Sequence, residues 1–178
     1  MNIFFLHFDA KTCVQLYVDK HVLKMIIETL QLLCGVHHMT MTQTSTYKPK
    51  YKLTHKNHPC AKWTRASLSN YKWLCELGIE LCKEYTFRYE KIHKCQSIIE
   101  DLTENLPNII DIGFLSPYQA MPDMYRDEDP IEAYKQYYIF EKNHIHKWKK
   151  RKIPDFIQEA YDLIGKENLI KEYISKKY

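Results

Sequence analysis

The chain has 178 residues, 45% of them hydrophobic, with a formal net charge of +4 and an isoelectric point of about 8.6. These values predict one folded domain with a buried core, and they exclude disordered and fibrous classes. No apolar run reaches the roughly 20 residues needed to cross a bilayer, and the beginning "MNIFFLHFDAKTC" lacks the basic leader of a signal peptide. We therefore expect an intracellular protein that does not insert into a membrane.

The distribution of glycine, proline and apolar residues predicts an all-α fold. The chain has four glycines and seven prolines, and strand-like alternation is weak beyond residues 2–8. Apolar periodicity predicts a first helix from about Asp9 or Thr12 to Cys34, with Gly35 as its stop. We expect a compact, single-domain bundle of long antiparallel helices over residues 1–178.

The later helices have clearer start signals. After the polar loop 39–57, "NHP" at 57–59 predicts a second long helix that reaches about Tyr89, and a short helix is expected at 96–105. "DPIE" at 129–132 predicts a capped helix start, with the helix continuing to about Arg151. Two further helices are expected, one from Pro154 and one in "ENLIKEYISKKY", residues 167–178.

The six cysteines include no CxxC pair, and most fall in predicted helices, where a free thiol behaves as a small hydrophobic group. The expected compartment favours reduced structural thiols over a disulfide framework. The residues concerned are Cys13, Cys34, Cys60, Cys75, Cys82 and Cys95.

A row of polar residues interrupts the apolar stretch "DKHVLKMIIETLQLL" at residues 19–33. His21, Lys24, Glu28 and Gln31 are spaced by three, four and three residues, so they share one helical face. One interpretation is a solvated Lys24–Glu28 pair. The other, which we favour because apolar residues flank the narrow row, is the wall of a reactive site. Asp19 lies on the opposite, apolar face, where a carboxylate needs a partner.

The segment "KNHIHKWKKRK", residues 142–152, carries six lysines and arginines and no acid. Such a segment is typical of a surface that binds a polyanion, and equally of a solvated helix end. In the first case the phosphate contacts would come from Lys142, Lys147, Lys149, Lys150 and Arg151.

Nine histidines raise the question of a metal site. His37, His38, His55 and His58 flank the polar loop and are the candidate ligands, but the chain contains no HExxH motif. It also contains no glycine-rich phosphate loop and no GxSxG elbow. We expect neither a metal nor a cofactor.

Two resemblances extend these predictions. "DKHVLKM", "NHPCAKW" and "AMPD" with a later "EK…W" resemble a set of small proteins from phages and large DNA viruses, and this resemblance brings no established activity. The beginning "MNIFFLH", followed by "DAKTCVQLYVDKHVL", is similar to the opening of the pyrimidine-dimer DNA glycosylases. "HKNHP" resembles a histidine-proline segment of bacterial members of that family.

The glycosylase resemblance implies a compact all-α enzyme whose own α-amine attacks the sugar C1′ and forms a Schiff base. An α-amine suits this role because its usual pKa, about 7.7–8.0, leaves a neutral fraction near pH 7. The resemblance implies Met1 as the nucleophile and Asp19 as the assisting carboxylate, although the family's arginine before that acid is Val18 here. Helical geometry leaves an alternative, in which Glu28 with Lys24 performs the chemistry.

The hypothesis from sequence is thus a DNA glycosylase/AP lyase that acts on duplex DNA. The proposed catalytic residues are Met1, Asp19, His21, Lys24 and Glu28, while Gln31 and His58 would add nucleic-acid contacts. The segment "SPYQAMPDMYR" would either wedge or receive the target nucleotide, or simply pack on the core. The alternatives are a non-enzymatic DNA- or RNA-binding protein and a metal-dependent nuclease.

Overall fold

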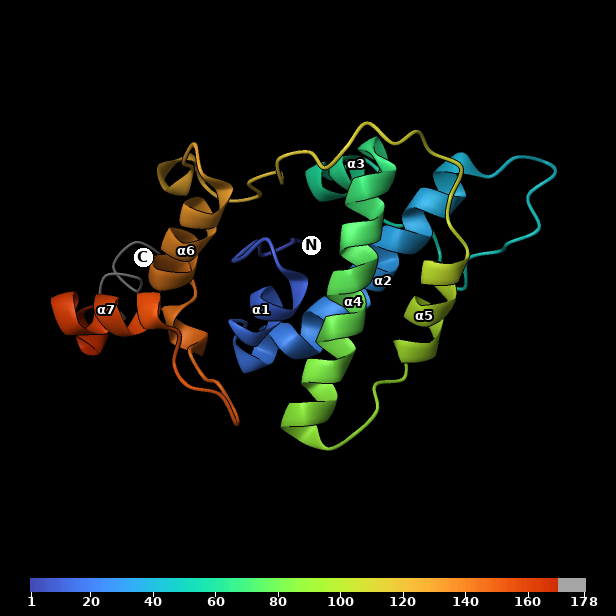
Figure 1. Cartoon of the computed structure of the whole chain (residues 1–178). Helices are drawn as coiled ribbons and strands as arrows, with labels where there is room; N and C mark the ends of the chain where they lie inside the picture. The colour runs from blue at the N-terminus through green and yellow to red at the C-terminus, as the bar shows by residue number, and fades with distance from the viewer. Residues whose placement is uncertain (170–178) are drawn as a thin grey trace.

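The regular elements of residues 1–169, the part of the chain described by a computed structural model, are all helical. The two longest helices are α2 (Asp19–Thr40) and α4 (Leu68–Tyr89). Helix α4 is central and contacts α1 (Ala10–Gln15), α2, α3 (Pro59–Ala66) and α5 (Gln96–Glu104), as Figure 1 shows. The predicted all-α class is therefore confirmed.

Close helix packing in the core depends on a small residue. A Cβ atom on Gly78 of α4 would lie 3.0 Å from Ile99 of α5 and 3.1 Å from Thr29 of α2. Because these are buried side chains with little room to move, glycine is what lets α2, α4 and α5 meet at this level.

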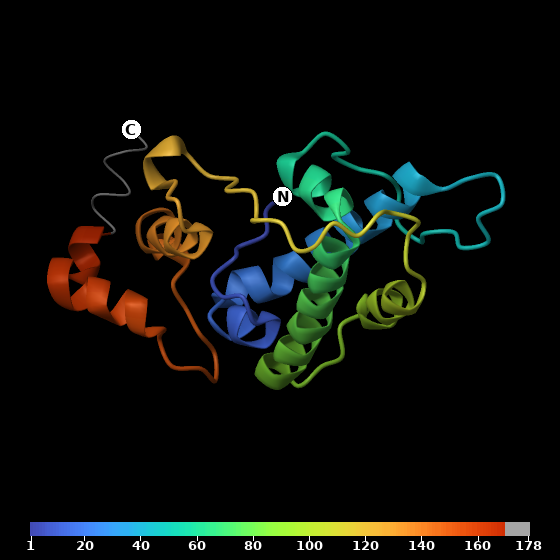
Figure 2. The same cartoon turned by 45° about the horizontal axis from the view of Figure 1, so that its top comes forward.

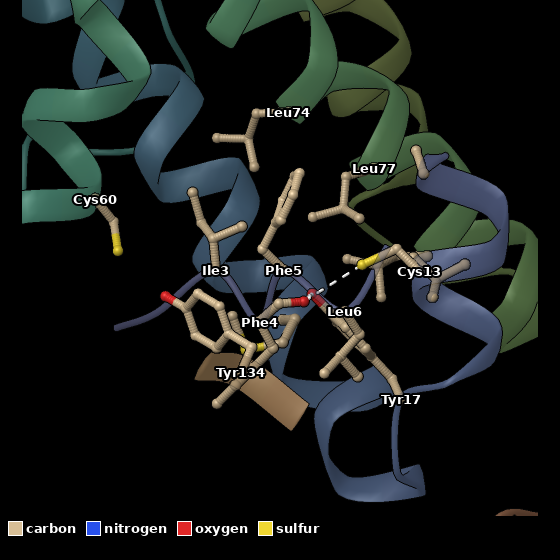
Figure 3. Packing of buried hydrophobic residues seen from close by; sticks show 14 of the residues in the cluster. Ile3, Phe4, Phe5, Leu6, Cys13, Tyr17, Cys60, Leu74, Leu77 and Tyr134 are labelled. Carbon is tan, nitrogen blue, oxygen red and sulfur yellow. Dashed lines mark hydrogen bonds between the residues drawn. The ribbon is translucent and has the colours of Figure 1, made fainter. Parts of the chain in front are cut away.

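The N-terminal segment, residues 1–8, is extended and lies between α6 (Pro130–Glu141) and the α2–α4 pair (Figures 1 and 2). Phe4 packs edge-on against Tyr134 and Tyr138 of α6, whereas the ring of Phe5 lies 4.8 Å from that of Trp73 on α4. In Figure 3, Phe5 reaches toward Leu74 and Leu77, and Tyr134 lies on the other side of the segment. Residues 2–6 of this extended segment are thus buried on both faces, whereas His7 and Phe8 are exposed.

The last third of the described chain begins with an extended segment that follows α5 and crosses over the α3 end of α4 (Figures 1 and 2). The 3₁₀ helix η1 (Asp123–Tyr125) then leads into α6, and η2 (Asn143–Ile145) follows it. The basic segment precedes α7 (Asp155–Ile164). No described helix has the combination of length and apolarity required of a bilayer span.

Several expected helix boundaries are confirmed. Helix α5 spans nearly the predicted residues, α6 begins at Pro130 with Asp129 as its cap, and α7 begins directly after Pro154. The six cysteines are buried and none forms a disulfide. The predicted last helix, 167–178, lies mostly outside the described residues.

Three expected helices differ from the observed ones. The first helix is divided into α1 and α2 at residues 16–18, and it continues through Gly35 to Thr40. The second is interrupted at Ser67, whose backbone is extended, so α3 and α4 are separate helices. The helix from Pro130 ends at Glu141, and the basic segment after it is largely irregular.

Candidate functional site

An amine and a carboxylate meet where the N-terminal segment crosses α2. The α-amino nitrogen of Met1 lies 3.8 Å from Oε2 of Glu28, and the same oxygen accepts a hydrogen bond of 3.1 Å from the Asn2 backbone N–H. The Lys24 ammonium lies 3.3 Å from the other oxygen, Oε1. The Glu28 side chain is 12% exposed and that of Lys24 69% exposed, so the carboxylate is enclosed and the lysine reaches into solvent.

The Asn2 side chain fixes the position of the first residue. Its Oδ1 accepts a 2.8 Å hydrogen bond from the Tyr134 hydroxyl of α6, and its Nδ2 donates a 2.9 Å bond to the Ala120 carbonyl. The Cys60 thiol of α3 approaches the same Oδ1 at 3.9 Å. Because Asn2 is buried and held from three directions, the backbone that carries the Met1 amine is anchored to separate parts of the fold.

His21, at the other end of the polar row, is enclosed. Its ring stacks on Phe4 with 4.0 Å between centroids, and its Nδ1 lies 2.5 Å from the Tyr138 hydroxyl. Burial, with a smaller contribution from the positive charges of Lys142 and Lys24, lowers the pKa of His21 to about 3. The imidazole is therefore neutral near pH 7, and its ring packs against Phe4 of the N-terminal segment.

His58 lies close to the amine, in the first turn of α3. As the N-cap of α3 it accepts a 3.2 Å hydrogen bond from the Cys60 N–H through Nδ1, which places the proton of a neutral ring on Nε2. Burial and then the positive charge of the Met1 amine lower the pKa of His58, while Glu28 opposes this shift. Gln31, half-buried one turn beyond Glu28, adjoins Lys56 and Arg65.

Asp19 is part of a different structure. Its Oδ1 accepts hydrogen bonds from the buried Arg88 guanidinium at 2.9 Å and from the Lys149 backbone N–H at 2.8 Å. Arg88 also binds Glu84 at 2.7 Å, so the pair belongs to a buried ionic network. The carboxylate that adjoins the Met1 amine is Glu28, and Asp19 is placed as a partner of Arg88.

Carboxylates and aromatic rings already engage most of the basic segment. Arg151 makes two hydrogen bonds to Glu84, at 3.0 and 2.8 Å, and Lys150 pairs with Glu90. The Lys142 ammonium lies 4.5 Å from the Tyr137 ring centroid, and that of Lys149 5.2 Å from the Tyr89 ring centroid, in cation–π contacts. Lys147 is exposed. Among the predicted phosphate contacts, Lys147 is thus the exposed residue for which the described part of the chain shows neither an ion pair nor a cation–π contact.

A hollow of about 620 Å³ lies between α3 and the segment 116–119, and neither Met1 nor Glu28 lines it. The α3 side is formed by Pro59, Lys62, Trp63 and Ala66, and Arg126 closes the far side. The hollow is connected to Asn2 through Tyr134, because the Tyr134 hydroxyl lies 2.8 Å both from Asn2 Oδ1 and from the carbonyl oxygen of Tyr118, a residue of the hollow.

Sequence reasoning missed Asn2, Tyr134 and the α3 residues of the hollow, whereas the other side of the hollow belongs to the segment "SPYQAMPDMYR", which the sequence had indicated as a possible nucleotide contact. The spacing of Pro59, Lys62, Trp63 and Ala66 marks one helical face, and that signal was present in the sequence. The contact between Asn2 and Tyr134 had none, since it joins residues 132 apart.

The candidate metal ligands are dispersed among other partners. His37 bonds to the Tyr71 hydroxyl at 2.9 Å and His38 to the Tyr51 carbonyl at 2.8 Å, while His58 caps α3. Across residues 1–169 there is no cluster of three or more His, Cys, Asp or Glu side chains suited to a metal ion. Comparison with protein-family models, curated proteins and solved structures found no match to this chain.

Proposed function

We propose that the protein is a DNA glycosylase/AP lyase in which the α-amine of Met1 is the nucleophile and Glu28 the assisting carboxylate. The single observation that carries this proposal is the 3.8 Å separation of the Met1 nitrogen from Oε2 of Glu28, a carboxylate whose side chain is only 12% exposed. A salt bridge between an α-amine and a carboxylate also occurs as a plain structural feature. The anchoring of Asn2, which fixes the position of the amine, therefore gives the proposal a second and separate support.

The chemistry follows from these two groups. The neutral amine forms a bond to C1′ as the bond from C1′ to the base breaks, and the base leaves with the electron pair of that bond. Glu28 accepts the proton released by the amine and returns it to O4′ as the C1′–O4′ bond opens, which leaves a Schiff base between Met1 and C1′. Glu28, again a carboxylate, then accepts the C2′ proton as the C3′–O3′ bond breaks and the 3′ phosphate leaves with the electron pair of that bond, and water hydrolyses the Schiff base.

The surrounding residues have supporting roles in this proposal. Lys24 keeps its ammonium in solvent next to Glu28, where it can contact a phosphate of the substrate. In this proposal the Nε2–H of neutral His58 serves as a donor to the sugar or the departing base. A protein with this activity acts on intracellular DNA.

The experiment is borohydride trapping on duplexes with an abasic site or ultraviolet damage, with and without EDTA. We expect a covalent adduct that survives EDTA and that peptide mass spectrometry maps to Met1. The Glu28→Gln variant should lower the trapping rate by about 100-fold or more, as loss of an acid–base group does. Glu132→Gln, in an exposed ion pair on α6, is the matched control and should trap at the normal rate.

Other outcomes are equally informative. Retention on DNA with no adduct would reject the lyase in favour of a non-enzymatic binding protein. Strand cleavage that EDTA abolishes would reject it in favour of a metal-dependent nuclease. An adduct mapped to a surface lysine would show incidental amine reactivity and would also overturn the assignment of Met1.

A further inference from the structure

The hollow beside α3 combines an apolar wall with a cationic rim. Pro59, Trp63 and Ala66 form the apolar wall, and the Trp63 indole is fixed by a 3.0 Å hydrogen bond from Nε1 to the Leu115 carbonyl. Tyr118, which also lines the hollow, is 44% exposed. An exposed tyrosine ring in a hollow with apolar lining residues is suited to stacking a planar ligand.

Two cations flank this ring. The exposed Lys62 projects from α3, and the Arg126 guanidinium lies 6.0 Å from the Tyr118 ring centroid. Arg126 pairs with Asp123 at 2.8 Å, but that aspartate is 89% exposed, so the pairing is weak and leaves the guanidinium free to bind an anion. None of residues 116–119, which line one side of the hollow, is acidic. This segment therefore does not neutralise the positive charges of Lys62 and Arg126.

From this arrangement we infer that the hollow is a nucleotide-binding site, in which a base stacks on Tyr118 against the Trp63 wall and a phosphate binds Lys62 and Arg126. The volume of about 620 Å³ falls within the usual range for small-ligand sites. A planar heterocycle joined to a phosphate is the ligand class that satisfies both the apolar wall and the two cations.

The site is linked to the Met1 amine through one hydroxyl group. The Tyr134 hydroxyl has a single hydrogen and two acceptors at 2.8 Å, the Asn2 Oδ1 and the Tyr118 carbonyl. A ligand that shifts the backbone at Tyr118 therefore changes the hydrogen bond available to Asn2. The binding site itself goes beyond the proposed chemistry, since its test requires no reaction at Met1.

The test is equilibrium binding of a mononucleotide, followed by tryptophan fluorescence and calorimetry on the full chain. We expect saturable binding, with the corresponding nucleoside about tenfold weaker because it lacks the charge-assisted contacts. Lys62→Ala and Arg126→Ala should each weaken the mononucleotide and leave the nucleoside unchanged. Tyr118→Ala should weaken both ligands, whereas Tyr118→Phe, which keeps the ring, should bind both normally.

Matched controls and competitors complete the experiment. Lys72→Ala removes an exposed lysine of α4 outside the hollow and should bind as the parent protein does. Equal affinity for nucleotide and nucleoside, or no effect of Lys62→Ala and Arg126→Ala together, would overturn the inference. Because Tyr118 is exposed, its replacement should leave the melting temperature unchanged, which separates lost binding from lost folding.

The source of the nucleotide is read from competition. Displacement by an oligonucleotide with one unpaired nucleotide, but not by a fully paired duplex, would identify a nucleotide presented by a strand. No displacement by either would identify a free mononucleotide. Nucleotide binding without any borohydride adduct would overturn the proposed lyase and leave this site intact, so the two proposals fail separately.

Discussion

Asn2 gives the N-terminus a defined position that a chain terminus usually lacks. Ends of chains are mostly mobile unless they are tied down, and here one side chain bonds to α6 and to the Ala120 carbonyl. Such anchoring is what a reacting amine requires, since a displacement of about 1 Å can cost about 100-fold in rate. We therefore regard Asn2 and Tyr134 as positioning residues for Met1.

Tyr134→Phe tests this role by removing one hydroxyl. We expect a stability loss of about 1–2 kcal/mol, because buried partners of the hydroxyl lose their hydrogen bond. We also expect a rate of Schiff-base trapping lower by about tenfold or more, with unchanged duplex affinity. Tyr137→Phe, on the same helix, is the control. A drop in affinity that parallels the drop in rate would show that the hydroxyl serves binding and not the placement of the amine.

Two buried histidines, His21 and His37, and the half-buried His146 make the fold sensitive to acid. Burial, as the largest cause, lowers the pKa of His21 to about 3 and those of His37 and His146 to about 4. His146 is satisfied as a neutral ring, with the Tyr161 hydroxyl 2.6 Å from Nδ1 and the Tyr138 carbonyl 3.0 Å from Nε2. In the folded protein these three histidines are therefore uncharged near pH 7.

The sign of the pH effect follows from these lowered values. Below the ordinary pKa of 6.5 the unfolded chain binds protons that the folded chain does not, so the free energy of unfolding falls as pH falls from 6.5 toward 4. At pH 5 the loss is about 2 kcal/mol for a fully shifted histidine. Urea titrations at pH 7 and pH 5 measure it. His146→Gln should reduce the difference between the two, and replacement of the exposed His55 should not; equal effects would contradict this origin.

At the scale of elements, the breaks between helices are stabilised from far away in the sequence. At the α1–α2 break, the Arg88 guanidinium binds the carbonyls of Gln15 and Tyr17, at 3.1 and 2.8 Å. The Trp148 indole N–H binds the Leu16 carbonyl at 2.9 Å. Carbonyls that a continuous helix would have used are thus satisfied by side chains more than 70 residues away, and no local glycine or proline marks the break.

The α3–α4 break has the same cause. Asp111, over 40 residues from the break, accepts hydrogen bonds from the Ser67 and Ser69 hydroxyls at 2.9 and 2.7 Å. The hydrogen bond from the Ser69 hydroxyl lowers the pKa of Asp111 most. Those from the Gly113 N–H and the Ser67 hydroxyl also contribute, and the pKa falls to about 2. Local periodicity predicts helices well, but it has no information on a distant cap, which is why both breaks were missed.

The same reasoning explains which parts of the site were predictable. Lys24 and Glu28 share a face because of helical spacing alone, and the sequence indicates this directly. The choice between Glu28 and Asp19 depended on which one meets Met1, a question of tertiary structure. Gly35 misled the first helix boundary because the helix continues where Val36 and His37 are buried, and burial outweighs the low helix propensity of glycine.

Asp19→Asn separates the two carboxylates experimentally. It leaves the buried Arg88 with a weaker partner, so we expect a loss of about 3 kcal/mol in the free energy of unfolding, measured by denaturant titration. Glu132→Gln, in a half-exposed pair with Lys135, should cost below about 1 kcal/mol. If Asp19 is structural, trapping per folded molecule stays normal in Asp19→Asn. A normal stability with abolished trapping would restore Asp19 as the assisting acid.

At the scale of the whole molecule, the distribution of charge matters more than the net value of +4. Part of the basic segment stabilises the fold, since Arg151 and Arg88 together neutralise the buried Glu84. Burial alone would raise the pKa of Glu84, but the hydrogen bonds from Arg151 and Arg88 outweigh it and lower that pKa. Positive charge used inside the fold in this way adds little to a binding surface.

For the proposed binding of DNA, this division predicts which cations make the phosphate contacts. Lys147 and Lys152 are exposed, so replacing both by alanine should reduce the slope of log Kobs against log salt concentration by about 1.8, or about 0.9 for each lost phosphate contact. Fluorescence anisotropy with a short duplex at several salt concentrations measures this.

The control pair Lys72→Ala with Lys94→Ala removes the same charge elsewhere on the surface, and its slope should stay unchanged. Arg151→Ala should act differently, by lowering stability, because it removes one of the two arginines that pair with Glu84. Equal slopes for the two lysine pairs would mean that DNA is held by diffuse charge, and the basic segment would then have no special part in recognition.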